Sequence, residues 1–266
     1  MTNPETIWRD VAALREKCPL VHNITNFVVM NVTANALLAI GASPIMAHAP
    51  EELEDLLGIA SALVLNIGTL DLAWIECMKM AAEEANKRRI PIIFDPVGAG
   101  ASRLRTKTSL ALMELARPAV LRANPSEILA LAGASGATKG VDSAHRSEDA
   151  EDAARNLAKL NECVVVASGP VDFITDGTTD FRVSGGSPLM PRITGMGCTS
   201  TALLGAFATV TTPLNAATAA MSVMKIAAEM AAEKALGPAT LQVHFLDALH
   251  NLSQAHILQH LKIARG

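Results

Sequence analysis

The chain has 266 residues, a formal net charge of −4 and a hydrophobic content of 50%. The balance of 22 Lys and Arg against 26 Asp and Glu leaves no basic surplus for a nucleic-acid backbone, and the hydrophobic content excludes a disordered chain. Aromatic residues make up only 3%, with no Tyr, so the core has to be built mainly from aliphatic side chains and Met.

Short β-branched runs alternate with longer amphipathic stretches in the first part of the chain. This alternation is typical of parallel strands connected by crossover helices. One helix is predicted from Asn26 to Ile40, with Gly41 as its left-handed cap, and another is capped by Asp71 and runs to about Lys87. The predicted strands span residues 20–23, 43–47, 62–67, 91–95, 120–123 and 163–168.

The pattern changes around residue 168. Residues 164–186 read as consecutive short strands joined by Gly-Pro and Asp-Gly turns, which predicts an antiparallel extension of the sheet. Beyond Gly197, Ala-rich helices are predicted over 198–211, 214–236 and 240–264. We therefore expect one α/β domain over residues 1–266, with a mostly parallel central sheet flanked by helices and a helical C-terminal part.

Two stretches, 18–50 and 193–224, contain no Asp, Glu, Lys or Arg. A membrane span needs about 20 mostly apolar residues, but Asn, Thr, Gly and Pro interrupt both stretches, so we expect deep burial or a subunit interface and no membrane association. The N-terminal segment lacks the apolar run of a secretory signal. The four cysteines form no CxxC pair, and a reducing cytoplasm fits this spacing best.

Polar residues follow several predicted strands, where ligands bind in a parallel sheet. Asp95 ends one strand and is followed by small residues at 96–100. Two interpretations stay open for it, because it could cap the next turn or help to hold a magnesium ion that bridges nucleotide phosphates. Asn23, Thr25 and Asn26 are expected to face the same ligand crevice.

Glu127 lies in the first turn of a short helix that Pro125 and Ser126 open. Its charge interacts favourably with the helix dipole, which explains an isolated Glu without any ligand. Together with Asp95, however, it makes two carboxylates at adjacent strand ends, and such a pair suits a magnesium ion.

Gly195 and Gly197 bracket the start of a predicted helix, whose first backbone N–H groups have no intrahelical partners. This arrangement can bind an anion such as a transferring phosphoryl group, or it can be a tight turn into a buried helix. Cys198 lies in the first turn, where the helix should lower the pKa of its thiol so that it could accept a proton or act as a nucleophile. It could equally be a small buried hydrophobe.

Five segments in matching order along nearly the full chain resemble the hydroxyethylthiazole kinase family, which has the ribokinase-like fold. They are HNITN at 22–26, GASPIMAHAPEE at 41–52, DPVGAG at 95–100, NPSE at 124–127 and GMGC at 195–198. The resemblance implies an ATP- and Mg²⁺-dependent enzyme of thiamine synthesis and salvage. It also implies a homotrimer with the substrate pocket between subunits.

The resemblance also assigns roles to individual residues. It implies that Met46 and Gly195 contact the thiazole alcohol, and that Arg122 and Ser168 contact the nucleotide phosphates, with Gly197 beside them at the helix start. Asp95 and Glu127 match the acidic positions associated with magnesium. Cys198 stands where the wider ribokinase-like group carries an aspartate as general base, and in this respect the chain agrees with the thiazole kinases.

The expected reaction is phosphorylation of the hydroxyl of 4-methyl-5-(2-hydroxyethyl)thiazole by ATP, giving the thiazole phosphate and ADP. Three alternatives remain at this point. The first is a kinase for a related alcohol such as hydroxymethylpyrimidine, and the second is a nucleotide-dependent dehydratase on the same fold, which would be expected to keep Asp at position 198. The third is a regulator that binds thiazole or nucleotide without turnover.

Overall fold

A computed structural model describes residues 2–136 and 146–266 of the chain. Its described strands form one nine-stranded sheet in the order β2-β1-β3-β4-β5-β6-β7-β8-β9. The first six strands in this order are parallel, and β7, β8 and β9 extend the sheet antiparallel. The strands are β1 (Leu20–Ile24), β2 (Ser43–Ile45), β3 (Ala62–Asn66), β4 (Ile92–Asp95), β5 (Val120–Ala123), β6 (Val164–Ala167), β7 (Asp172–Thr175), β8 (Asp180–Val183) and β9 (Ile263–Arg265).

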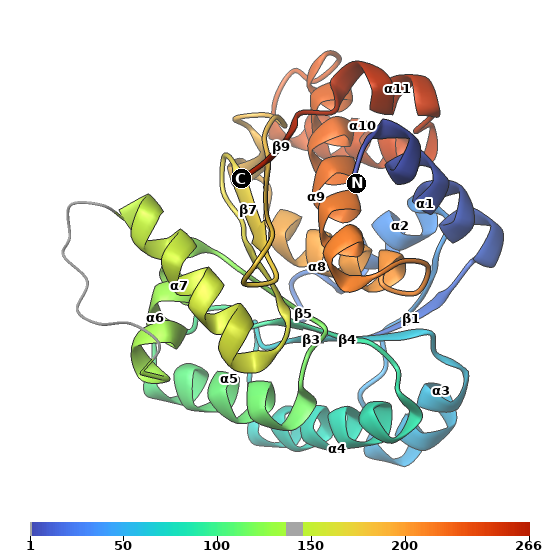
Figure 1. The fold of residues 1–266 in the computed structure, drawn as a ribbon. Coiled ribbons are helices and arrows are strands. Elements are labelled where there is room, and N and C mark those ends of the chain that lie inside the picture. The colour runs from blue at the N-terminus through green and yellow to red at the C-terminus, as the bar shows by residue number, and fades with distance from the viewer. Residues whose placement is uncertain (1, 137–145) are drawn as a thin grey trace.

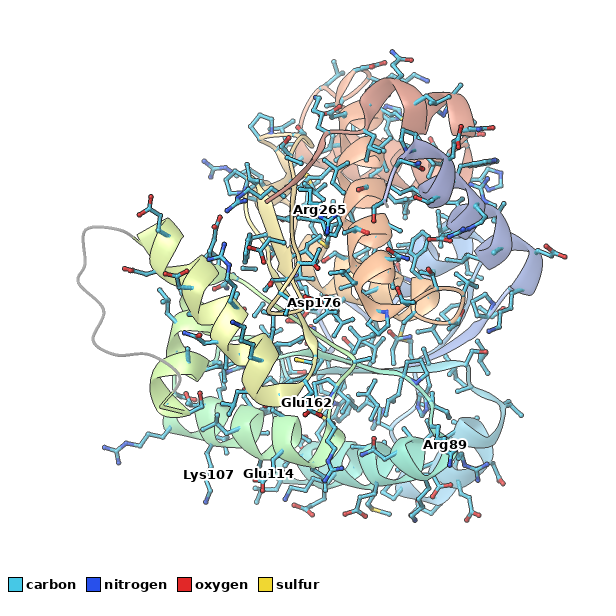
Figure 2. All side chains as sticks on the ribbon, in the orientation of Figure 1. Arg89, Lys107, Glu114, Glu162, Asp176 and Arg265 are labelled. Carbon is cyan, nitrogen blue, oxygen red and sulfur yellow. The ribbon has the colours of Figure 1, made fainter. Side chains whose placement is uncertain are left out.

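Helices cover both faces of the sheet (Figure 1). One face packs against α3 (Leu53–Ile59), α4 (Leu72–Arg88), α5 (Arg103–Ala116), α6 (Pro125–Ala134) and α7 (Arg146–Asn161). The other face packs against α1 (Pro4–Lys17), α2 (Met30–Ile40), α8 (Met196–Phe207), α9 (Pro213–Ala232), α10 (Pro238–His250) and α11 (Gln254–His260). Charged side chains lie on the outside of these layers, as Lys107 and Glu114 of α5 show in Figure 2.

Helix α8 lies directly on the parallel strands. A Cβ atom on Gly205 would come within 2.8 Å of Val64 Cγ2 and 3.1 Å of Val21 Cγ1, so only glycine allows this approach of helix to sheet. Residues Thr199 to Phe207 of α8 are all buried, as is most of α9. Deep burial therefore accounts for residues 199–207 and 216–224 of the charge-free stretch at 193–224, but not for 208–215 between them.

The α/β class with its mostly parallel sheet, the six parallel strands and the antiparallel extension are confirmed. All described strands lie in one sheet. The expectation of one domain over residues 1–266 stays a prediction, because residue 1 and residues 137–145 lie outside the described residues. None of the helices in the described ranges is long and apolar enough to cross a membrane.

Four helix predictions are wrong in their bounds: the helix predicted over 198–211 ends at Phe207, the one predicted over 214–236 ends at Ala232, and the other two differ as follows. Helix α2 begins at Met30 because Asn26 accepts a hydrogen bond from the Val28 N–H at 3.1 Å and does not cap the helix. The predicted helix 240–264 is broken after His250, where Ser253 starts α11 with a capping box. Its last residues form β9, which pairs antiparallel with β8 and covers that edge of the sheet.

Candidate active site

Four polar side chains at the carboxyl ends of β3, β4, β5 and β6 face α8. In each strand the residue two positions earlier is a valine or isoleucine of the core on the α8 side, and side chains alternate along a strand. The same alternation therefore directs the four polar residues toward the start of α8, and they are Asn66, Asp95, Arg122 and Ser168.

Asp95 is completely buried, with 0% of its surface exposed. Its Oδ2 accepts hydrogen bonds from Thr201 Oγ1 at 2.7 Å and Asn66 Nδ2 at 2.9 Å, and Arg122 Nη1 lies 3.7 Å away. Its Oδ1 has no hydrogen-bond partner. Burial raises the pKa of Asp95 to about 6 although Arg122 opposes the shift, so the carboxyl is ionised at neutral pH with one bare oxygen.

Arg122 connects Asp95 with Ser168 and with the start of α8. Its Nη2 donates to Ser168 Oγ. The guanidinium packs on Gly197, where a Cβ atom would lie 2.7 Å from Nη1 and 2.9 Å from Nη2. A side chain at position 197 would therefore push the guanidinium end of the arginine away from its present position, and glycine leaves room for this contact.

Glu127 binds backbone amides with both carboxylate oxygens. Oε2 accepts from the Asn124 N–H at 2.8 Å in a capping box, and Oε1 accepts from the Gly98 N–H at 2.7 Å. The helix-start interpretation of Glu127 is thus confirmed, and the residue also holds the loop after β4. Its charge raises the pKa of Asp95, so the two carboxylates interact, but no group of three or more metal-binding side chains occurs within the described part of the chain.

Helix α8 starts at a left-handed glycine. Gly195 has φ 86° as N-cap, and no side chain caps the helix. A Cβ atom there would lie 2.9 Å from Val29 Cγ1, so both conformation and space require glycine. The tight turn is therefore real, and it leaves the first amides of α8 without a side-chain partner, as an anion site requires.

Cys198 does not have the acidic thiol that its helix position predicts. Burial, together with the charge of Asp95, raises the pKa of Cys198 to about 11. Asn26 Nδ2 lies 3.6 Å from the sulfur and opposes the shift only weakly. The expectation of a lowered pKa is wrong because burial outweighs the helix start, and the thiol is protonated at neutral pH.

A chain of amides joins Cys198 to Asp95. Asn26 Nδ2 donates to Asn66 Oδ1 at 2.8 Å, and the Gly68 N–H donates to the same oxygen at 3.0 Å. These two donors fix the Asn66 amide so that its Nδ2 faces Asp95. Asn26 is not among the residues that line the cavity, so its place at the ligand crevice stays a prediction. Asn66 lies in one of the polar segments that follow the predicted strands, but its link between Asn26 and Asp95 was not predicted.

A cavity of about 830 Å³ lies between the start of α8, helix α9 and the loops that follow β6 and β8. Its lining includes Arg122, Ser168, Gly195 and Gly197, whereas Met46, Asp95, Glu127 and Cys198 are not among its lining residues. Lining residues that the sequence analysis missed include Asp172, Met190, Ile193, Met221, Met224 and Lys225, whereas Asn124 belongs to the NPSE segment at 124–127. Lys225 could have been found as the charge that ends the neutral stretch 193–224.

Met46 lies just after β2, on the far side of β1 from this cavity, and is half-buried. Nearby, His48 stacks on Trp74 with ring centroids 3.9 Å apart, and Phe27 lies 4.9 Å from the same indole. Phe27 and Val28 are each 62% exposed. The charge-free stretch 18–50 is therefore partly at the surface.

The fold is that of the ribokinase-like class. Pyridoxal kinase from Staphylococcus aureus shares the fold at 17% identity, with a TM-score of 0.62 over 80% of this chain and 88% of that one. Within this class, the chain belongs to the hydroxyethylthiazole kinase family, whose profile matches residues 11–255.

Relatives across this family resemble the chain over its whole length. Hydroxyethylthiazole kinase from Nitratidesulfovibrio vulgaris (strain Miyazaki F) is 56% identical over 100% of both chains, and that from Syntrophus aciditrophicus is 52% identical over 99% of this chain and 98% of its own. A solved structure of hydroxyethylthiazole kinase protein from Pyrococcus horikoshii OT3 is 44% identical, with a TM-score of 0.93 over 98% and 99% of the two chains.

Proposed function

We propose that this protein transfers the terminal phosphoryl group of ATP to the hydroxyl of 4-methyl-5-(2-hydroxyethyl)thiazole, giving the thiazole phosphate and ADP for thiamine synthesis. The observation that carries the proposal is the start of α8, where the Arg122 guanidinium rests on Gly197 beside the buried carboxylate of Asp95. The full-length similarity to hydroxyethylthiazole kinases supports this choice of alcohol.

The protein contributes to this reaction mainly by positioning groups and by stabilising charge. Phosphoryl transfer passes through a loose transition state, with negative charge spread over the equatorial oxygens. In our proposal Arg122, Ser168 and the amides at Gly195 and Gly197 bind the nucleotide phosphates, while the base and ribose occupy the apolar end of the cavity. Preorganised donors of this kind need no reorganisation during the reaction.

Asp95 and Glu127 are the residues that would hold magnesium. The bare Oδ1 of Asp95 fits this role, because Mg²⁺ prefers oxygen ligands and an unpaired buried carboxylate oxygen is costly. Glu127 lies close enough to raise the pKa of Asp95, so the positive charge of a bound cation would relieve the repulsion between the two carboxylates. When bound, the ion would neutralise charge on the phosphates.

Cys198 is proposed to accept the hydroxyl proton as a thiolate, and it is a secondary contributor because its pKa of about 11 leaves only a small fraction of the thiol deprotonated at neutral pH. Cys198→Asp should preserve or raise kcat, because a carboxylate is ionised at neutral pH, whereas Cys198→Ala should lower kcat by about 10²-fold with little change in ATP affinity. Steady-state kinetics of the three proteins measures both effects. An Asp variant that folds and binds both substrates but does not turn over would contradict the base role.

We further propose a cytoplasmic homotrimer whose thiazole pocket lies between subunits, with Met46 and Gly195 contacting the alcohol. Exposed apolar side chains at Phe27 and Val28, close to the start of α8, support an interface there. Light scattering during size-exclusion chromatography should give three times the mass of 27.9 kDa, and Phe27→Asp should reduce it. A monomeric and fully active protein would contradict a shared pocket.

The function itself is tested by ADP release coupled to a spectroscopic assay, with the thiazole alcohol, with hydroxymethylpyrimidine and with neither. We expect magnesium-dependent ADP release with the thiazole alcohol at least tenfold faster than with the pyrimidine. Faster turnover of the pyrimidine would identify a different kinase. Binding of ATP and alcohol without ADP release would identify a regulator instead.

A further inference from the structure

Two opposite charges are buried in the wall of the cavity. Lys225 of α9 is 6% exposed and Asp172, at the start of β7, is 1% exposed. Lys225 Nζ lies 3.4 Å from Asp172 Oδ2, and both residues line the cavity. Isolated charges are expensive to bury, so a pair at this place requires an explanation.

Lys225 is tied to the protein by two hydrogen bonds and an ion pair. Its Nζ donates to the Gly169 carbonyl at 2.7 Å and the Pro170 carbonyl at 3.1 Å, and Asp172 Oδ2 lies 3.4 Å away as its ion-pair partner. Two of the three N–H donors of the ammonium group are therefore occupied by backbone carbonyls. These contacts place the side chain where it can hold the protein around the nucleotide.

These contacts fix the turn that follows Ser168. Lys225 holds its two carbonyls, and Asp172 Oδ1 accepts from the Gly169 N–H at 2.8 Å. On the opposite wall, a Cβ atom on Gly186 would lie 3.1 Å from Lys225 Cδ, so the lysine stem packs below that loop. Lys225 thus joins the two loops that form the sides of the cavity.

Lys225 also neutralises the negative charge of Asp172, which would otherwise repel nucleotide phosphates in the cavity. Burial raises the pKa of Asp172, whereas Lys225 and Arg122 both lower it, so Asp172 lies within electrostatic reach of the phosphate-binding arginine. An unbalanced carboxylate there would repel a nucleotide triphosphate across a medium of low dielectric constant. It would also compete with the phosphates for Arg122.

We propose that Lys225 is a positioning residue of the nucleotide site, which neutralises Asp172 and holds the turn after Ser168. This inference rests on the proposed function, because it requires ATP in the cavity. It predicts opposite effects for the two members of the pair. Removing Lys225 leaves a repulsive carboxylate, whereas removing the charge of Asp172 leaves an attractive ammonium.

Calorimetric titration with a non-hydrolysable ATP analogue, together with kinetics, tests this prediction. Lys225→Met should weaken nucleotide binding by about 10- to 100-fold and leave KM for the thiazole alcohol unchanged. Lys225→Met combined with Asp172→Asn should recover most of this loss, because an amide oxygen can still accept from Gly169. Asp172→Asn alone should bind the analogue as tightly as the unmodified protein or more tightly.

Lys234→Met is the matched control, because it removes the same charge from an exposed position, and its affinity should stay within twofold. Thermal unfolding shows whether each variant is folded. If Lys225→Met does not fold, the nucleotide affinity of Asp172→Asn decides whether the charge balance matters for binding. Weaker binding by Asp172→Asn, or a double variant no better than Lys225→Met, would overturn the charge-balance role. An unmodified protein that binds no nucleotide would overturn the proposed function as well, whereas normal binding by Lys225→Met overturns this inference alone.

Discussion

Asp95→Asn should lower kcat by about 10³-fold and leave the fold as stable as before or more stable. The loss of activity is expected because a neutral amide would hold a magnesium ion and the Arg122 guanidinium less strongly than the negative carboxylate does. The gain in stability follows from burial, which raises the pKa of this carboxyl from 3.8 to about 6. A shift of about two units corresponds to about 3 kcal/mol at neutral pH, which is the upper limit of the gain.

The sign of this effect depends on pH. An acid whose pKa is higher in the folded state than in the unfolded state destabilises the folded state once the pH exceeds the unfolded pKa. The cost of Asp95 is therefore absent below about pH 4, grows between about pH 4 and pH 6, and is complete above pH 6. Urea unfolding at pH 7.5 and pH 4 measures it in both proteins. Asp10→Asn, which changes a buried carboxylate paired with Arg9, is the control and should keep full activity. Equal activity of Asp95→Asn and unmodified protein would remove Asp95 from the reaction.

Gly197→Ala should lower kcat/KM by about 10²-fold through a single added methyl group. That methyl would lie 2.7 Å from Arg122 Nη1, so the guanidinium has to move away from Asp95 and Ser168. A displacement of about 1 Å in a phosphate-binding group is enough for a loss of this size. Kinetics with varied ATP should show a higher KM for the nucleotide.

Gly133→Ala provides the comparison for this variant. Gly133 lies in helix α6, and no atom lies within 4 Å of the position that an added methyl group would take, so alanine should stabilise the helix by about 0.5–1 kcal/mol and leave kinetics unchanged. Normal kinetics for Gly197→Ala, in a protein that melts normally, would mean that the guanidinium position does not matter for turnover.

Local signals in the sequence were sufficient for most of the fold. The strands were predicted because each is a short β-branched run that ends in a polar or Gly-rich segment, as at Asp95. The capping box of Asn124 and Glu127 has a local pattern of the same kind. The three residues of β9 were missed because their pairing with β8 is a contact between distant parts of the chain, with no periodicity of its own.

The electrostatics of the site could not be predicted in the same way. The pKa of Cys198 depends on burial and on Asp95, which is far away in sequence, and both effects oppose the helix start. The contact between Gly197 and Arg122 depends on where α8 crosses the sheet, which Gly205 and Val64 determine. Such properties follow from the register of packed elements and not from any one segment.

The rings of His48 and Phe27 that contact Trp74 make the intrinsic fluorescence of this tryptophan a probe of the neighbouring site. The chain has two tryptophans, and a Trp8→Phe variant would leave the indole between His48 and Phe27 as the single emitter. Phe27 directly follows Asn26, whose amide touches Cys198. Any ligand that shifts this asparagine will therefore change the fluorescence of Trp74, so occupancy beside the sulfur can be followed without an attached dye.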